Sequence, residues 1–103
     1  MRDRRRELQD KLEEILGSDH VYFQPPETVK LVYPCIIYER LRVASVYADN
    51  KEYNGRVRYR LTYISYDPDL TLHRQFAEVL PYLSYDNTFV RDGLNHDVYT
   101  FYY

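Results

Sequence analysis

Apolar and polar side chains alternate most regularly between Arg56 and Tyr66. Successive side chains of a β-strand point to opposite faces, so this alternation predicts a strand with one buried face and one wet face. The buried side carries Val57, Tyr59, Leu61 and Tyr63, and the wet side carries Arg56, Arg58, Arg60 and Thr62. From Ile64 onward the wet side turns apolar, which predicts cover on both faces there. We expect this strand at or next to the centre of one sheet.

Two segments have the spacing of amphipathic helices, with apolar residues at i, i+4, i+7 and i+8. The first covers residues 4–16 and ends before Gly17, which suits the left-handed conformation that closes many helices. The second follows Asp67-Pro68-Asp69, where Asp69 is the expected N-cap, and it ends at Pro81. The two apolar stripes are Leu8, Leu12, Ile15 and Leu16, and Leu72, Phe76, Val79 and Leu80.

The first half of the chain contains two further strand patterns. A short one at 20–23 stops before Pro25-Pro26. A nearly continuous apolar run at 35–40 predicts a strand buried on both faces. Residues 41–55 then lead to the central strand, and their cluster of Asp, Asn and Gly is typical of an irregular hairpin tip.

The end of the chain predicts a hairpin. Two strand patterns flank Arg91-Asp92-Gly93, a plausible tight turn, and the second strand runs from His96 to Tyr103. The predicted order is therefore α-β-β-β-α-β-β over a single domain, residues 1–103. This order predicts an α+β fold with a single, mostly antiparallel sheet and two helices packed on one face.

Composition changes this picture in one respect, the use of tyrosine. The chain has 103 residues, a hydrophobic content of 45% and 13 Tyr, with no Trp. Tyrosine suits a pleated, half-buried surface and also contacts with other proteins, so a Tyr-rich core and a Tyr-rich interface are both open. The net charge of −2 gives no global basic field that would recruit nucleic acid. No apolar run approaches membrane-spanning length.

No combination of residues has the pattern of an active site. Cys35 lies in an apolar run and fits a buried thiol better than a nucleophile. His96 and Asp97 are adjacent in a predicted strand, so their side chains should diverge, with Asn95 and His96 bonded to the preceding turn. His20 and His73 are scattered, without a cysteine pair to complete a metal site. We therefore expect no enzyme activity, no metal and no cofactor.

The remaining chemical feature is the basic row Arg56, Arg58 and Arg60, which Arg40 and Arg42 of the neighbouring strand could join. Such a row can contact nucleic-acid phosphates or an acidic partner. It can equally be an exposed face whose arginines pair across strands with carboxylates. The carboxylates available for that pairing are Glu39, Asp49 and Glu52.

Two strings of residues are distinctive. The first is Ala48-Asp49-Asn50-Lys51-x-Tyr53, followed by the Tyr-rich strand and Asp67-Pro68-Asp69. The second is Leu80-Pro81-Tyr82, followed by residues 94–103. Together they resemble the small tail-completion or tail-terminator proteins of long-tailed bacteriophages and prophages of Gram-positive hosts. The likeness extends over most of the chain, and its motifs are turns and strand ends, not catalytic signatures.

The resemblance implies a structural virion protein, present in the host cytoplasm during assembly, that forms a ring, commonly a hexamer. Such a ring caps the tail tube, stops its polymerisation and joins it to the head-side connector, with DNA only passing through the lumen. The partners implied are further copies of the chain, the tail tube protein and the connector protein. Candidate assembly residues from the shared strings are Asp49, Asn50, Tyr53, Asn95 and His96. The alternatives are a head-completion or neck adaptor protein, and a small nucleic-acid-binding module using the arginine row.

Overall fold

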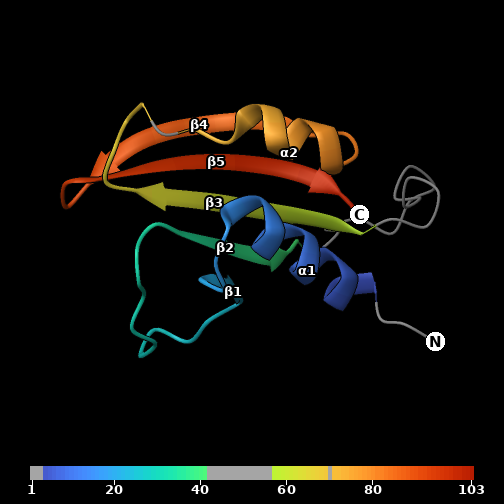
Figure 1. Cartoon of the computed structure of the whole chain (residues 1–103), viewed down its shortest axis with the longest axis horizontal. Helices are drawn as coiled ribbons and strands as arrows, with labels where there is room; N and C mark the ends of the chain where they lie inside the picture. Colours follow the sequence, from blue (N-terminus) through green and yellow to red (C-terminus); the bar gives the residue numbers. More distant parts are fainter. Residues whose placement is uncertain (1–3, 42–56, 70) are drawn as a thin grey trace.

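The computed structural model describes residues 4–41, 57–69 and 71–103 of the chain. Two helices and five strands follow one another in the predicted order, which confirms the α+β class (Figure 1). The helices are α1 (Arg4–Leu16) and α2 (His73–Val79). The strands are β1 (Val21–Phe23), β2 (Cys35–Arg40), β3 (Arg58–Ser65), β4 (Ser84–Arg91) and β5 (Leu94–Tyr102).

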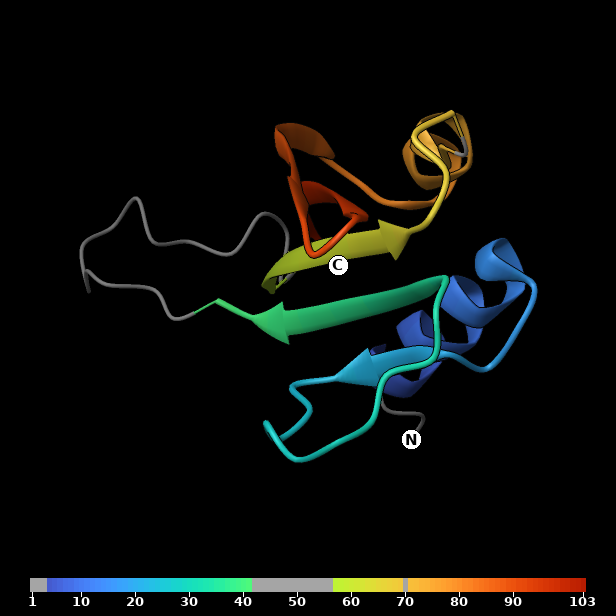
Figure 2. The same cartoon turned by 90° about the vertical axis from the view of Figure 1, so that its left-hand side faces the viewer.

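The strands form one mixed sheet in the order β1-β2-β3-β5-β4, so the most regular strand of the sequence, β3, lies at the centre as predicted. β1 runs parallel to β2, and all other neighbours are antiparallel. The register across the sheet places Tyr38 of β2 beside Leu61 of β3, which in turn lies beside Tyr99 of β5. Figure 2 shows the strong twist of this sheet.

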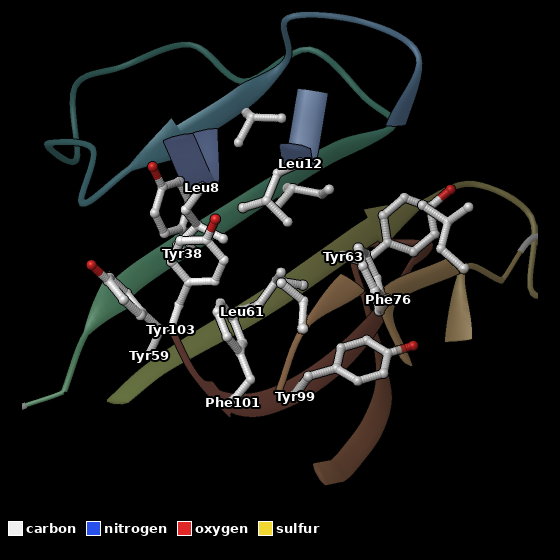
Figure 3. Close-up of a cluster of buried hydrophobic side chains, with 14 residues drawn as sticks. Leu8, Leu12, Tyr38, Tyr59, Leu61, Tyr63, Phe76, Tyr99, Phe101 and Tyr103 are labelled. Atoms are coloured by element: carbon white, nitrogen blue, oxygen red, sulfur yellow. The ribbon is translucent and has the colours of Figure 1, made fainter. Parts of the chain in front are cut away.

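One face of the sheet, called here the helix face, carries the core (Figure 3). On β3 the alternation works as the sequence predicts, because Tyr59, Leu61 and Tyr63 are almost completely buried on this face. Leu8 and Leu12 of α1 and Phe76 of α2 join the same cluster. Since the two helices also contact each other, they cover the helix face together. The opposite face is called the outer face.

Tyrosine is a major component of this core. The buried tyrosines are Tyr38, Tyr59, Tyr63, Tyr99 and Tyr103. The ring of a buried tyrosine supplies apolar area, and its hydroxyl requires a hydrogen-bond partner. Tyr38 donates to Oε1 of Gln9, and Tyr103 donates to Oε1 of Glu7, so both hydroxyls are satisfied by α1. A Tyr-rich core therefore accounts for part of the unusual composition.

The start of α2 differs from the prediction. Asp69 is not the N-cap: that position is Leu72, which makes no side-chain capping bond. The carboxylate of Asp67 instead accepts a hydrogen bond of 2.9 Å from the backbone N–H of Asp69. This is an Asx-turn, in which an Asp side chain accepts from the backbone N–H two residues later. Asp favours both Asx-turns and helix N-caps, so the residue type alone does not distinguish them. Leu72 and Leu80, outside the helix, are nevertheless buried.

The β4–β5 hairpin turns at Asp92-Gly93, as predicted. Both residues have positive φ, 55° at Asp92 and 76° at Gly93, which is the geometry of the tightest hairpin turns. β5 begins at Leu94, two residues before the predicted start at His96. The predicted hairpin tip within residues 41–55 lies mostly outside the described residues.

Candidate assembly edge and charged face

The two edges of the sheet are built differently, and β4 forms the long one. β4 pairs only with β5, and no strand lies on its other side within the part of the chain that the structure describes (Figure 1). Seven of its eight residues are exposed. An edge strand of this kind presents unpaired backbone N–H and C=O groups to any extended segment of another chain.

The side chains along β4 are partly apolar. On the helix face Tyr85 and Val90 are 50% and 68% exposed, and Tyr82, just before the strand, is 55% exposed. On the outer face the ring of Phe89 stacks on His96 with centroids 4.6 Å apart. Aromatic and β-branched residues are enriched in strands, so the exposed side of β4 is suited to pairing with a further strand.

A bulge at Asp86 divides β4 into two parts. Tyr85 lies opposite Tyr99 and Asn87 lies opposite Val98, which leaves Asp86 as the extra residue. Its carboxylate accepts hydrogen bonds from Thr100 Oγ1 and, at 2.7 Å, from Ser84 Oγ. These bonds, first that from Thr100 and then that from Ser84, lower the pKa of the Asp86 carboxyl. The bulge therefore holds a negative charge on the outer face of the edge.

The other edge, β1, is short and is closed by α1. β1 has three residues, and the carbonyl oxygen of Val21 accepts a hydrogen bond of 3.0 Å from Nε2 of Gln9. The guanidinium group of Arg5 lies 4.6 Å from the ring centre of Phe23. Side chains of α1 thus occupy the outward carbonyl of Val21 and cover the Phe23 ring at this edge.

The outer face carries a row of charged and hydroxyl groups across four strands. Arg60 of β3 lies between Glu39 of β2 and Thr100 of β5, and Ser84 of β4 follows. Arg60 Nη1 lies 3.2 Å from Oε2 of Glu39, so the cross-strand ion pair that the sequence offered as an alternative is present. Arg58 and Arg60 also help to lower the pKa of Asp86. The face therefore alternates in charge.

The structure places the two described assembly candidates at the start of β5. Nδ1 of His96 lies 3.1 Å from the carbonyl oxygen of Leu94, which agrees with the predicted bond to the turn. Asn95 lies between Ser65 and Val90 and is half-buried. His96 and Asp97 diverge as expected: Asp97 points to the helix face and accepts from Thr88 Oγ1 at 2.9 Å. The other candidates, Asp49, Asn50, Tyr53 and Arg56, lie outside the described residues.

Sequence reasoning missed one polar cluster below α2. The hydroxyl of Tyr99 and Nδ1 of His73 share a hydrogen bond, and the centre of the His73 ring lies 4.6 Å from that of the Tyr85 ring. The Tyr85 hydroxyl donates to Asp97 Oδ1 at 3.2 Å. Burial raises the pKa of the Tyr99 hydroxyl, so this hydroxyl stays protonated. These groups bond one another and connect α2 to β4 and β5. No local sequence pattern marks this cluster, because tertiary folding brings together members that are up to 26 residues apart.

Two further features complete the chemistry of the described residues. Cys35 is fully buried, and desolvation raises the pKa of its thiol to about 11, as expected of an unreactive thiol. An open groove of about 340 Å³ lies where residues 24–31 pass Ile37 and Glu39. Two carboxylates line it, Glu27 and Glu39, and Glu39 is already paired with Arg60. Among residues 4–41, 57–69 and 71–103, no three His, Cys, Asp or Glu side chains are grouped to hold a metal ion.

No model of a known protein family matches the sequence. A search of curated proteins finds no significant match either. Among the described residues, neither helix has the length and apolar character needed to cross a membrane.

Proposed function

We propose that this protein is a structural subunit of a phage tail, a tail terminator that caps the tail tube and joins it to the head-side connector. It acts as a ring of copies, by surface complementarity, and makes or breaks no covalent bond. Two kinds of support meet in this proposal. One is the resemblance of residues 48–69 and 80–103 to tail-completion proteins, and the other is the construction of the sheet.

The observation that carries the proposal is the open edge of β4 in a sheet whose other edge is closed. Proteins that remain monomeric protect long edge strands with charges, prolines, β-bulges or covering segments. β4 has a bulge and a charge at Asp86 and a second charge at Arg91, but residues 87–90 between them carry none, and the apolar side chains of Tyr82, Tyr85 and Val90 are exposed. Tyr and Arg are enriched in interfaces and Lys is depleted, and this chain has three Lys.

A head-completion or neck adaptor protein would use the same kind of surface. The two roles differ in the partner: a terminator binds the end of the tube, and an adaptor binds the connector before the tail arrives. Genes for a tail tube protein and a tape-measure protein immediately downstream would favour the terminator.

The decisive experiment is assembly of the tail tube protein with and without this chain. We expect tubes of defined length ending in a ring when the chain is present, and continued polymerisation when it is absent, both visible by electron microscopy. Tubes that grow equally long in both samples would overturn the terminator role. Binding to isolated connectors would then support the adaptor role.

The nucleic-acid alternative depends on Arg58 and Arg60. Glu39 pairs with Arg60, and both arginines lie close enough to Asp86 to help lower the pKa of its carboxyl. Neighbouring carboxylates therefore offset the positive charge of the row. We expect weak duplex binding that Arg58→Ala/Arg60→Ala leaves unchanged. A large loss of affinity in this variant, with a steep dependence on salt, would favour the nucleic-acid module instead.

A further inference from the structure

We propose that the β4 edge pairs with β4 of a second copy of the chain, antiparallel and centred on Phe89, so that two sheets become one. The inference deepens the proposed function and rests on its claim that this edge is an assembly contact. It concerns the free protein, before any tail is bound.

The partner is a second copy because β4 complements itself. Asp86 on the outer face is negative, and Arg91, five residues along the same strand, is positive and also lies on the outer face. Antiparallel pairing of two such strands brings the Arg91 end of each to the Asp86 end of the other. The β1 edge of a second copy is not an alternative, because it has three residues and its Val21 carbonyl is bonded to Gln9.

The register follows from the regular part of the strand. Pairing is uninterrupted only between the bulge at Asp86 and the turn at Asp92, which leaves residues 87–91. The midpoint of this stretch is Phe89. A two-fold axis through the midpoint keeps the helix face of both copies on the same side, as a continuous antiparallel sheet requires.

Each facing pair in this register is compatible. Phe89 meets Phe89 of the second copy on the outer face, an aromatic pair of the kind that stabilises neighbouring strands. Thr88 faces Val90 on the helix face, and Asn87 faces Arg91 on the outer face. Arg91 then lies next to the Asp86 carboxylate of the other copy. The same contacts occur twice, because the axis relates them.

The pairing has a consequence for assembly. A ring closed by head-to-tail contacts joins two different patches of each copy, whereas a two-fold pair joins the same patch. The β4–β4 pair must therefore open before a head-to-tail ring uses this edge. The free dimer would keep the edge covered until a tube end or a growing ring competes for it.

Disulfide trapping in the full chain tests the register. A mixture of Asn87→Cys chains with Arg91→Cys chains should cross-link rapidly under mild oxidation, because facing Cβ atoms lie about 4.5–5.5 Å apart. Phe89→Cys alone should also cross-link. Asn87→Cys alone and Arg91→Cys alone are the matched controls, since each lies about four residues from its own copy in this register. Cys35 is buried in every sample and should not react.

We expect the mixture and Phe89→Cys to form covalent dimers at least about tenfold faster than the two controls. Equal rates in all four samples would overturn the register. Sedimentation of the unmodified chain separates the two proposals. An oligomer without Cys-specific trapping defeats the β4–β4 pair and leaves the assembly role intact. A chain that stays monomeric and also fails to cap tubes defeats both.

Discussion

The two edges of one sheet are treated in opposite ways. At β1 the chain places a 13-residue helix, a glutamine bonded to the Val21 carbonyl and an arginine over Phe23. At β4 an eight-residue strand is left with seven exposed residues. No described strand other than β5 lies beside β4, so its outward backbone groups are open to pairing, as the proposed assembly role requires. Side chains of a helix thus contact the short edge strand β1, whereas most residues of the long edge strand β4 are exposed.

The β1 edge depends on the packing of α1 against the core. The largest loss of stability should therefore come from a substitution that weakens this packing. Leu12 is fully buried in the core, and Leu12→Ala should lower the free energy of unfolding by about 2–5 kcal/mol, through lost apolar contact and the cavity left behind. Urea denaturation measures the change. Val90→Ala is the control on the open edge and should stay within about 0.5 kcal/mol. Similar losses of unfolding free energy in Leu12→Ala and Val90→Ala would contradict the difference between the two edges.

Gln9 should have the next largest effect. Gln9→Glu keeps an acceptor for the Tyr38 hydroxyl but loses the donor to the Val21 carbonyl, and it places a carboxylate beside Glu13. We expect a loss of about 1–3 kcal/mol and faster hydrogen exchange in β1. Gln9→Ala adds no charge but also removes the acceptor for the Tyr38 hydroxyl, and it should likewise speed exchange in β1. An unchanged exchange rate in β1 would show that Gln9 does not close this edge.

On the open edge, Val90→Lys should affect association and not folding. The side chain is 68% exposed, so the free energy of unfolding should change by less than about 0.5 kcal/mol. A lysine on an edge strand opposes pairing, so the dissociation constant of the dimer should rise about tenfold or more. Sedimentation at several concentrations measures this, with Val32→Lys, also on an exposed site, as the control. Equal dissociation constants in the two variants would argue against the edge.

The smallest effect should come from Asp86→Asn and should depend on pH. The folded pKa of Asp86 lies below its unfolded value of about 3.9, so the ionised form stabilises the fold above that value. This contribution is lost as the pH falls through the folded pKa. Wild type should therefore be more stable than the variant at neutral pH, by well under about 1 kcal/mol because the side chain is exposed. Thermal unfolding at several pH values should show the difference narrowing in acid; a difference independent of pH would exclude this origin.

Local sequence patterns predicted most of the fold. Residues 4–16 and 35–40 form the predicted elements, and β3 is the central strand, because its alternating side chains match a sheet with one covered face. The prediction of Asp69 as the N-cap was wrong: Asp69 lies in a turn closed by the Asp67 carboxylate, and the helix starts after Leu72. The parallel pairing of β1 with β2 was not predictable from alternation, because alternation does not determine strand order.

Less of the candidate site could be read from the sequence. The sequence offered Glu39 as one of several possible partners for the arginine row, and only the strand register brings it to Arg60. The open edge of β4 could not be predicted, because an edge is defined by the strand that is missing beside it. The bulge at Asp86 and the His73–Tyr99 bond likewise arise from contacts between distant segments. The assembly candidates on residues 48–55 remain predictions.

The contact between Tyr103 and α1 has a consequence for the order of folding. Tyr103 donates to Glu7, 96 residues earlier, and the side chains of Arg4 and Lys11 lie over its ring. Because these contacts join segments at opposite ends of the described residues, α1 cannot complete its packing before residue 103 is in place. A contact over so large a sequence separation carries a high loop-closure cost, so we expect it to form late in folding.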